Sequence, residues 1–140
     1  MKRILSLTSL LLVCVMLLCL VSCNTVDKAG LWENAKYRRD MEFGDGSKTV
    51  AVEVKVGDDS ITFTIHTDKD TLGDALVEHD LISGEEGAYG LYVKYVNGIY
   101  ADYDTDGSYW AFYSNGEYMM SAVDSTYIYG GEHYELVYTK

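Results

Sequence analysis

Hydrophobic and polar residues alternate along much of the chain, in runs typical of strands with one buried face. In the run 48–56, KTVAVEVKV, the four valines point to one side, and 60–67, SITFTIHT, repeats the pattern with Ile61, Phe63 and Ile65. Gly57-Asp58-Asp59 between them predicts a short hairpin turn. Later runs predict five more strands, at residues 88–96, 99–102, 109–114, 117–121 and 133–139.

One segment, 71–80, changes to the helical period. Leu72, Ala75, Leu76 and His79 fall on one stripe of the predicted helix, and Asp70 or Thr71 can cap its first turn. A hairpin, one helix and then further strands is the order of a β-grasp. We therefore expect an α+β fold, a mainly antiparallel sheet packed on one helix, with its other face open to solvent.

Two copies of Tyr-x-Asn-Gly-x-Tyr, at 95–100 and 113–118, predict two tight hairpins. Asn-Gly is the strongest short-range hairpin signal, because both turn residues need a positive φ and these two tolerate it. The first turn pairs Tyr95 with Tyr100, and the second pairs Tyr113 with Tyr118. Cross-strand aromatic pairs stabilise a sheet, so structural support is one reading of these tyrosines and ligand contact is the other.

Strand parity collects several tyrosines on the open face of the sheet. If Trp110 and Phe112 face the helix, then Tyr109, Ala111 and Tyr113 face outward, and Tyr118 follows Tyr113 by the hairpin pairing. The same reasoning puts Leu91 and Val93 in the core and Tyr92 outside. We expect Tyr92, Tyr109, Tyr113 and Tyr118 to form a ligand-binding surface around Ala111, because tyrosine offers a flat apolar body plus a hydroxyl. A covering loop, tether or second copy is the alternative, and a one-residue bulge would invert any assignment.

The run 71–140 resembles the transcobalamin-like C-terminal domain of many bacterial lipoproteins. The resemblance rests on four short motifs: Gly90-x-Tyr92-Val93, Val96-Asn97-Gly98, the run 109–113 (YWAFY) and Asn115-Gly116-Glu117. That domain resembles the β-domain that closes over cobalamin in transcobalamin and intrinsic factor. The resemblance implies the fold, and it implies cobalamin or another corrinoid as a possible ligand. Those carriers also have a large helical domain, for which this chain has no counterpart.

The N-terminus has the features of a bacterial lipoprotein signal peptide. Lys2 and Arg3 precede an apolar run from Ile4 to Val21. The ending Leu20-Val21-Ser22-Cys23 resembles a lipobox, which implies that Cys23 carries the lipid and becomes the mature N-terminus. An uncleaved membrane helix is the alternative, because about 18 apolar residues just span a bilayer. We expect residues 1–22 to be the signal peptide, 23–47 a tether and 48–140 the folded domain. Docking of Trp32 and Tyr37 on the domain is the alternative to a flexible tether.

The net charge argues against one class of partner, and the positions of the cysteines argue against a disulfide. Removal of residues 1–22 leaves 9 basic and 22 acidic residues, a net charge of −13. Such a surface argues against nucleic acid, where cationic contacts supply much of the attraction. All three cysteines, at 14, 19 and 23, lie in the export segment, so we expect no disulfide in the folded domain.

Other candidate chemistry in the sequence is weak. Asp102-x-Asp104-x-Asp106-Gly107 resembles the first half of a calcium loop, but the twelfth position is Tyr113 rather than a bidentate glutamate, so an acidic turn is expected. The histidines at 66, 79 and 133 show no metal-ligand spacing, and we expect His79 to be a packed or capping residue. Glu85-Glu86 reads as a solvated turn. No nucleophile elbow or Cys–His pair occurs, so we expect no enzyme, no resident cofactor and no metal site.

These observations predict a lipid-anchored module on the extracytoplasmic face of a bacterial membrane. It would bind a small ligand, cobalamin or another corrinoid by the resemblance, in connection with uptake through a transporter or with a helical partner domain. The alternative is a structural or adhesion module whose tyrosine-rich face docks a protein or a cell-wall polymer. A deep cavity would favour the first reading, and a flat face would favour the second.

Overall fold

The computed structural model describes residues 28–140, so the predicted signal peptide, Cys23 and the first residues of the predicted tether lie outside the described part. The larger sheet is built from β1 (Met41–Gly44), β2 (Lys48–Val56), β3 (Asp59–Thr67), β7 (Tyr109–Ser114), β8 (Glu117–Tyr118) and β9 (His133–Thr139). The smaller sheet is built from β4 (Ile82–Gly87), β5 (Gly90–Val96) and β6 (Ile99–Tyr100). The helical elements are α2 (Lys28–Leu31), η1 (Trp32–Asn34), α3 (Leu72–Glu78), α4 (Tyr103–Asp106) and η2 (Val123–Ser125). Within residues 28–140, none of the helices has the length and apolar composition needed to cross a membrane.

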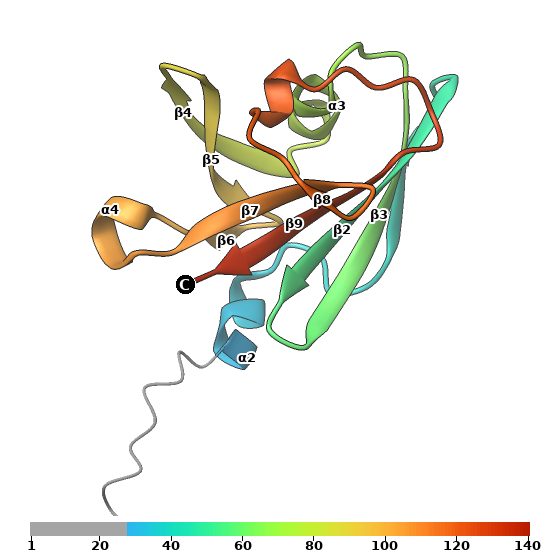
Figure 1. Ribbon diagram of the computed structural model, residues 1–140. Helices are drawn as coiled ribbons and strands as arrows, with labels where there is room; N and C mark the ends of the chain where they lie inside the picture. Colours follow the sequence, from blue (N-terminus) through green and yellow to red (C-terminus); the bar gives the residue numbers. More distant parts are fainter. Residues whose placement is uncertain (1–27) are drawn as a thin grey trace, which may run out of the picture.

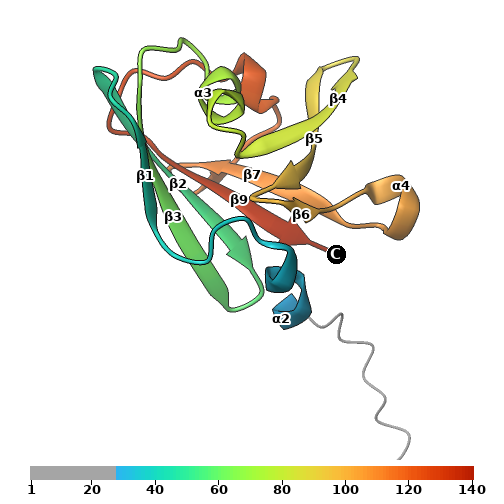
Figure 2. The same cartoon turned by 180° about the vertical axis from the view of Figure 1, so that it is seen from behind.

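The larger sheet has the order β1-β3-β2-β9-β7-β8, and it is mixed rather than mainly antiparallel. Strand β1 pairs with β3 in parallel, and β9 pairs with β2 in parallel, whereas β2–β3, β7–β9 and β7–β8 are antiparallel. Figure 1 shows α3, η2 and the β4–β5 hairpin gathered on one side of this sheet. The view from behind shows the chain running from α2 to β1 along the edge of the sheet (Figure 2).

The predicted β-grasp, one sheet on one helix, is therefore wrong. Strands β4, β5 and β6 form a separate three-stranded sheet instead of joining the larger one. Residues 28–140 also contain two short α-helices, α2 and α4, and two 3₁₀ turns, η1 and η2, besides α3. The sequence also gave no sign of β4, because its residues ISGEEG are polar and exposed after Ile82. Such a strand buries too little apolar surface to show a clear hydrophobic pattern.

Many of the predicted elements are nevertheless confirmed. The observed bounds of β2, β7 and β9 are the predicted ones, and β3 starts one residue earlier than predicted. Both Asn-Gly turns form, with Asn97 at φ 51° and Asn115 at φ 48°, and the predicted tyrosine pairs face each other across the two hairpins. Helix α3 is capped by Thr71, whose hydroxyl accepts a hydrogen bond from the backbone N–H of Asp74.

The core lies between the larger sheet and the elements stacked on it. Its strand residues are the inward positions that alternation predicts, and helix α3 adds Leu72, Ala75 and Leu76, all fully buried. Burying a large aliphatic side chain stabilises a fold by about 1.5–3 kcal/mol. This burial holds the strands in register, because a slip of one residue would expose the whole inward set.

The segment 28–47 is part of the fold rather than a flexible tether. Trp32 and Tyr37 pack against the core, and Tyr37 makes edge-on ring contacts with Phe43 and Phe63 at centroid distances of 5.4 and 5.9 Å. The fully buried Asn97 anchors the segment through its carboxamide, which accepts from the Tyr37 N–H at 2.9 Å and donates to the Tyr37 carbonyl at 2.7 Å. The docking of Trp32 and Tyr37 was the alternative that the sequence left open.

Candidate functional site

The outer face of β7 presents tyrosines on the side of the larger sheet away from α3. Trp110 and Phe112 are buried in the core, and their neighbours Tyr109 and Tyr113 are half-buried. The ring of Tyr118 on β8 packs edge-on against the ring of Tyr113 at 5.5 Å, and 54% of Tyr118 remains exposed. The face assignment made from strand parity agrees with the burial of Trp110 and Phe112, but Ala111, predicted at the centre of the open face, is itself only 3% exposed.

A fifth tyrosine, Tyr103 on α4, connects this face to the smaller sheet. Its ring lies 6.3 Å from that of Tyr109, and its backbone N–H donates to the hydroxyl of Tyr92 on β5 at 3.2 Å. We call these five residues, Tyr92, Tyr103, Tyr109, Tyr113 and Tyr118, the tyrosine row. The four tyrosines predicted from the sequence thus come from two different sheets. Tyr103 was missed because it lies in a turn where strand parity has no meaning.

The acidic turn at 102–107 holds Tyr103 in place. Asp102 caps α4, and its carboxylate accepts hydrogen bonds from the Tyr100 hydroxyl at 2.8 Å and the Thr105 hydroxyl at 2.9 Å. These bonds, the one from Tyr100 above all, lower the pKa of Asp102. Asp106 accepts from the backbone and hydroxyl of Ser108, which lowers its pKa as well. The geometry is that of a capped turn, as the sequence predicts.

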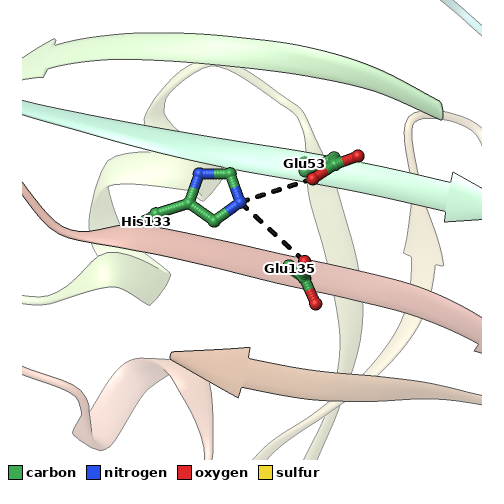
Figure 3. A group of neighbouring side chains, drawn as sticks. All are labelled: Glu53, His133 and Glu135. Carbon is green, nitrogen blue, oxygen red and sulfur yellow. Dashed lines mark ion pairs between the residues drawn. The ribbon is translucent and has the colours of Figure 1, made fainter. Parts of the chain in front are cut away.

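A polar cluster lies beside the tyrosine row on the same sheet face. It consists of Glu53 and Lys55 on β2 and of His133 and Glu135 on β9, and Figure 3 shows three of these side chains converging. Nε2 of His133 lies 3.3 Å from Oε2 of Glu53 and 3.9 Å from Oε1 of Glu135. Tyr113 is the cross-strand partner of Glu135, so the row and the cluster are adjacent.

Lys55 is the positive charge of this cluster. Its Nζ lies 2.7 Å from Oε1 of Glu135 and 3.6 Å from Oε2 of Glu53. The hydrogen bond to Glu135 raises the pKa of Lys55. The sequence did not predict this cluster, because the parallel pairing of β2 with β9 joins residues that are 80 positions apart. Only the spacing His133-x-Glu135, which puts both side chains on one strand face, was a visible signal.

The other two histidines make structural contacts. His66, on the outer face of β3, contacts the Thr49 hydroxyl through Nδ1 at 2.9 Å and Glu42 through Nε2 at 2.5 Å. The imidazole of His79 stacks on Phe43 at a centroid distance of 5.4 Å, and the residue is the C-cap of α3. The prediction that His79 is a packed or capping residue is confirmed.

A small cavity lies between β5, β7 and the segment 119–123. Its volume is about 140 Å³, and its walls are mainly apolar core residues, with Tyr92, Tyr109 and Tyr118 also bordering it. Trp110 lines the cavity too, and its buried indole Nε1 has no hydrogen-bond partner among the described residues. Drug-sized ligands occupy pockets of roughly 300–1,000 Å³, so this cavity can take only a small part of such a molecule.

Comparison with known proteins identifies the family and the fold. A crystal structure of a protein from Ruminococcus gnavus ATCC 29149, described as a candidate metal-binding protein, is 32% identical with a TM-score of 0.63. The match covers 67% of this chain and 98% of that one. The structure of haptocorrin in complex with Cbi is 21% identical with a TM-score of 0.56, and the match covers 70% of this chain but 26% of haptocorrin.

The similarity to haptocorrin supports the predicted transcobalamin-like fold. No curated protein matches the sequence. Residues 69–139 match the family DUF4430, a domain of unknown function, and extend over more than half of the chain. The chain therefore belongs to the DUF4430 family.

Proposed function

We propose that this protein is a ligand-binding module that uses the tyrosine row to contact a small molecule with a flat, apolar part. The observation that carries the proposal is the row itself. Tyr103 contacts Tyr92 and Tyr109 at one end of β7, and Tyr113 contacts Tyr118 at the other end. Tyr92, Tyr103 and Tyr118 are more than one-third exposed. Exposed aromatic clusters of this kind mark ligand or partner sites. Their rings lose little side-chain entropy on binding, and their hydroxyls can hydrogen-bond the polar edge of the ligand.

A corrinoid is the ligand that we test first. The haptocorrin structure of similar fold contains Cbi, and the Ruminococcus gnavus relative is also described by a binding role. The geometry predicts weak binding by this chain alone, because the row is an open surface and the cavity behind it holds only about 140 Å³. We therefore propose that a helical partner domain covers the exposed side of the ligand. The match to only 26% of haptocorrin is in line with this requirement.

The proposed location is the extracytoplasmic face of a bacterial membrane. Cys23 would carry the lipid, and the folded domain would begin within a few residues of the membrane, because residues 28–47 pack on the domain instead of forming a long tether. A ligand held there would be close to a membrane transporter, so we propose a role in ligand delivery for uptake.

The alternative is docking of a protein or cell-wall polymer, and the open shape of the tyrosine row favours it. Both readings predict that Tyr113→Ala and Tyr118→Ala weaken binding. Tyr129→Ala is the matched control, because Tyr129 is 83% exposed on the loop before β9 and is not part of the row. The two readings differ in what is bound.

The experiment is equilibrium dialysis of the full-length protein, in mild detergent, against cobinamide and cobalamin, with the corrinoid measured by its absorbance. Saturable binding that both row variants weaken and Tyr129→Ala leaves unchanged supports the proposal. Absence of saturable corrinoid binding, together with row-dependent sedimentation on purified peptidoglycan, would replace it by the adhesion reading. Corrinoid binding that is equal in all variants would exclude the tyrosine row as the site.

A further inference from the structure

The side chains of Glu53, His133 and Glu135 converge in a way that neither strand produces alone. Residues 133 and 135 project from the same face of β9, and the parallel register sets Glu53 directly opposite Glu135. One nitrogen and two carboxylate oxygens lie within 4.8 Å of one another, and all three residues are half-buried. Figure 3 shows them turned toward a common point above the sheet.

The separations fit a transition-metal ion. Zinc–ligand bonds of about 2.0–2.1 Å in tetrahedral geometry place neighbouring ligand atoms about 3.3 Å apart. The distance from His133 Nε2 to Glu53 Oε2 is 3.3 Å, and the distance to Glu135 Oε1 is 3.9 Å, so a small rotation of one carboxylate closes the set. From this geometry we infer that Glu53, His133 and Glu135 bind a divalent transition-metal ion, with Zn²⁺ as the best match to one imidazole and two carboxylates.

His133 is held in position by the second Asn-Gly hairpin. The backbone N–H of Asn115 donates to the His133 carbonyl at 2.7 Å, and the His133 N–H donates to Oδ1 of Asn115 at 3.2 Å. The turn thus clamps the backbone of the imidazole-bearing residue from both sides. A ligand whose backbone is fixed loses less conformational freedom when a metal binds.

Lys55 is a built-in competitor for the metal. Its ammonium group contacts Glu135 Oε1 and Glu53 Oε2, the same two oxygens that face His133. Two carboxylates at this spacing repel each other unless a cation lies between them. Lysine fills that role in the metal-free protein, and the arriving metal must displace it. Metal binding therefore replaces the Lys55 ammonium group between the two carboxylates with a divalent ion.

The test combines calorimetry and NMR on the full-length protein in mild detergent. Zn²⁺ is titrated into the wild type and the variants H133Q, E135Q, K55M and H66Q, whose folding is checked by circular dichroism. H66Q is the matched control, because His66 lies on the same sheet face beside a single carboxylate, that of Glu42. Histidine side-chain resonances report which of the three imidazoles meets the metal.

The expected result is one saturable Zn²⁺ per chain and a perturbed resonance of His133 alone. H133Q and E135Q should each weaken binding about tenfold or more, as loss of a ligand requires. K55M should tighten it about tenfold, because its competitor charge is gone. Equal weakening in H66Q, equal occupancy by Mg²⁺ and Ca²⁺, or no saturable binding at all would overturn the assignment. Unchanged affinity in K55M would overturn the competition by Lys55.

Discussion

Asn97 and Asn115 occupy the same position in two hairpins of the same sequence pattern, yet we predict very different effects of replacing them with alanine. Asn97 is fully buried and joins three segments: besides its two bonds to Tyr37, its N–H donates to the Leu81 carbonyl and its carbonyl accepts from the Lys36 N–H, each at 2.8 Å. The side chain of Asn115 lies at the surface and accepts one hydrogen bond, from His133.

The magnitudes follow from these contacts. Asn97→Ala leaves the N–H and carbonyl of Tyr37 unpaired in a half-buried position, at a cost of roughly 1–2 kcal/mol each. Alanine at φ 51° adds about 1 kcal/mol of backbone strain, so the free energy of unfolding should fall by about 3–5 kcal/mol. Asn115→Ala has the same strain but loses one exposed bond, so about 1.5–2 kcal/mol is expected. Glycine at either position would relieve the backbone strain, but it would not restore the hydrogen bonds of the asparagine side chain.

The assay is equilibrium unfolding in urea, followed by tryptophan fluorescence. A difference of about 2 kcal/mol separates the two midpoints by roughly 1 M when the urea slope is about 2 kcal/mol/M. The two tryptophans give a further control, because Trp32 reports on the segment before β1 and Trp110 on the core. In a protein that also carries Trp32→Phe, the tryptophan fluorescence comes from Trp110 alone. Equal midpoints for Asn97→Ala and Asn115→Ala would refute the claim that Asn97 fastens this segment to the domain.

Three further predictions test the anchor, the core and the acidic turn. Cys23→Ala should abolish incorporation of a palmitate analogue, and unchanged labelling would exclude the lipoprotein assignment. Trp110→Ala should lower the free energy of unfolding by about 3–5 kcal/mol, because it truncates a side chain in the core. Tyr113→Ala should lower it by about 1 kcal/mol, because it removes only a ring contact with Tyr118. Equal shifts in melting temperature for the two variants would contradict the face assignment. The lowered pKa of Asp102 contributes stability above pH about 4 that is lost in acid. Asp102→Asn should therefore reduce the fall in the free energy of unfolding, measured in urea, between pH 5 and 2. An unchanged pH dependence in this variant would argue against the linkage.

Local patterns in the sequence predicted local structure well. Alternation located β2 and β9 to the residue, because buried and half-buried positions alternate along most of each strand. The bounds of β7 were also correct, although three consecutive residues of this strand are buried. The Asn-Gly turns were equally clear, because the positive φ of both turn positions restricts the residues that fit. Burial at Trp110 and Phe112 followed from the same parity.

Features that depend on distant pairing could not be predicted in this way. Strand β1 is short, and only its parallel contact with β3 makes it a strand. The division into two sheets depends on which edges meet, and alternation carries no information about strand partners. For the same reason Tyr103 was not assigned to the tyrosine row and Glu53 was not connected with His133, although each residue is plainly visible in the sequence.

The position of β9 in the larger sheet affects the order in which the chain can fold. Ribosomes synthesise this strand after the other five, yet it lies between β2 and β7 and pairs with both. Until residues 133–139 have been made, β2 and β7 each expose an unpaired edge, the kind of edge that can pair with another chain. The sheet therefore cannot be completed before residues 133–139 are available, and a product that stops before β9 would be a target for proteases or aggregation instead of a smaller functional domain.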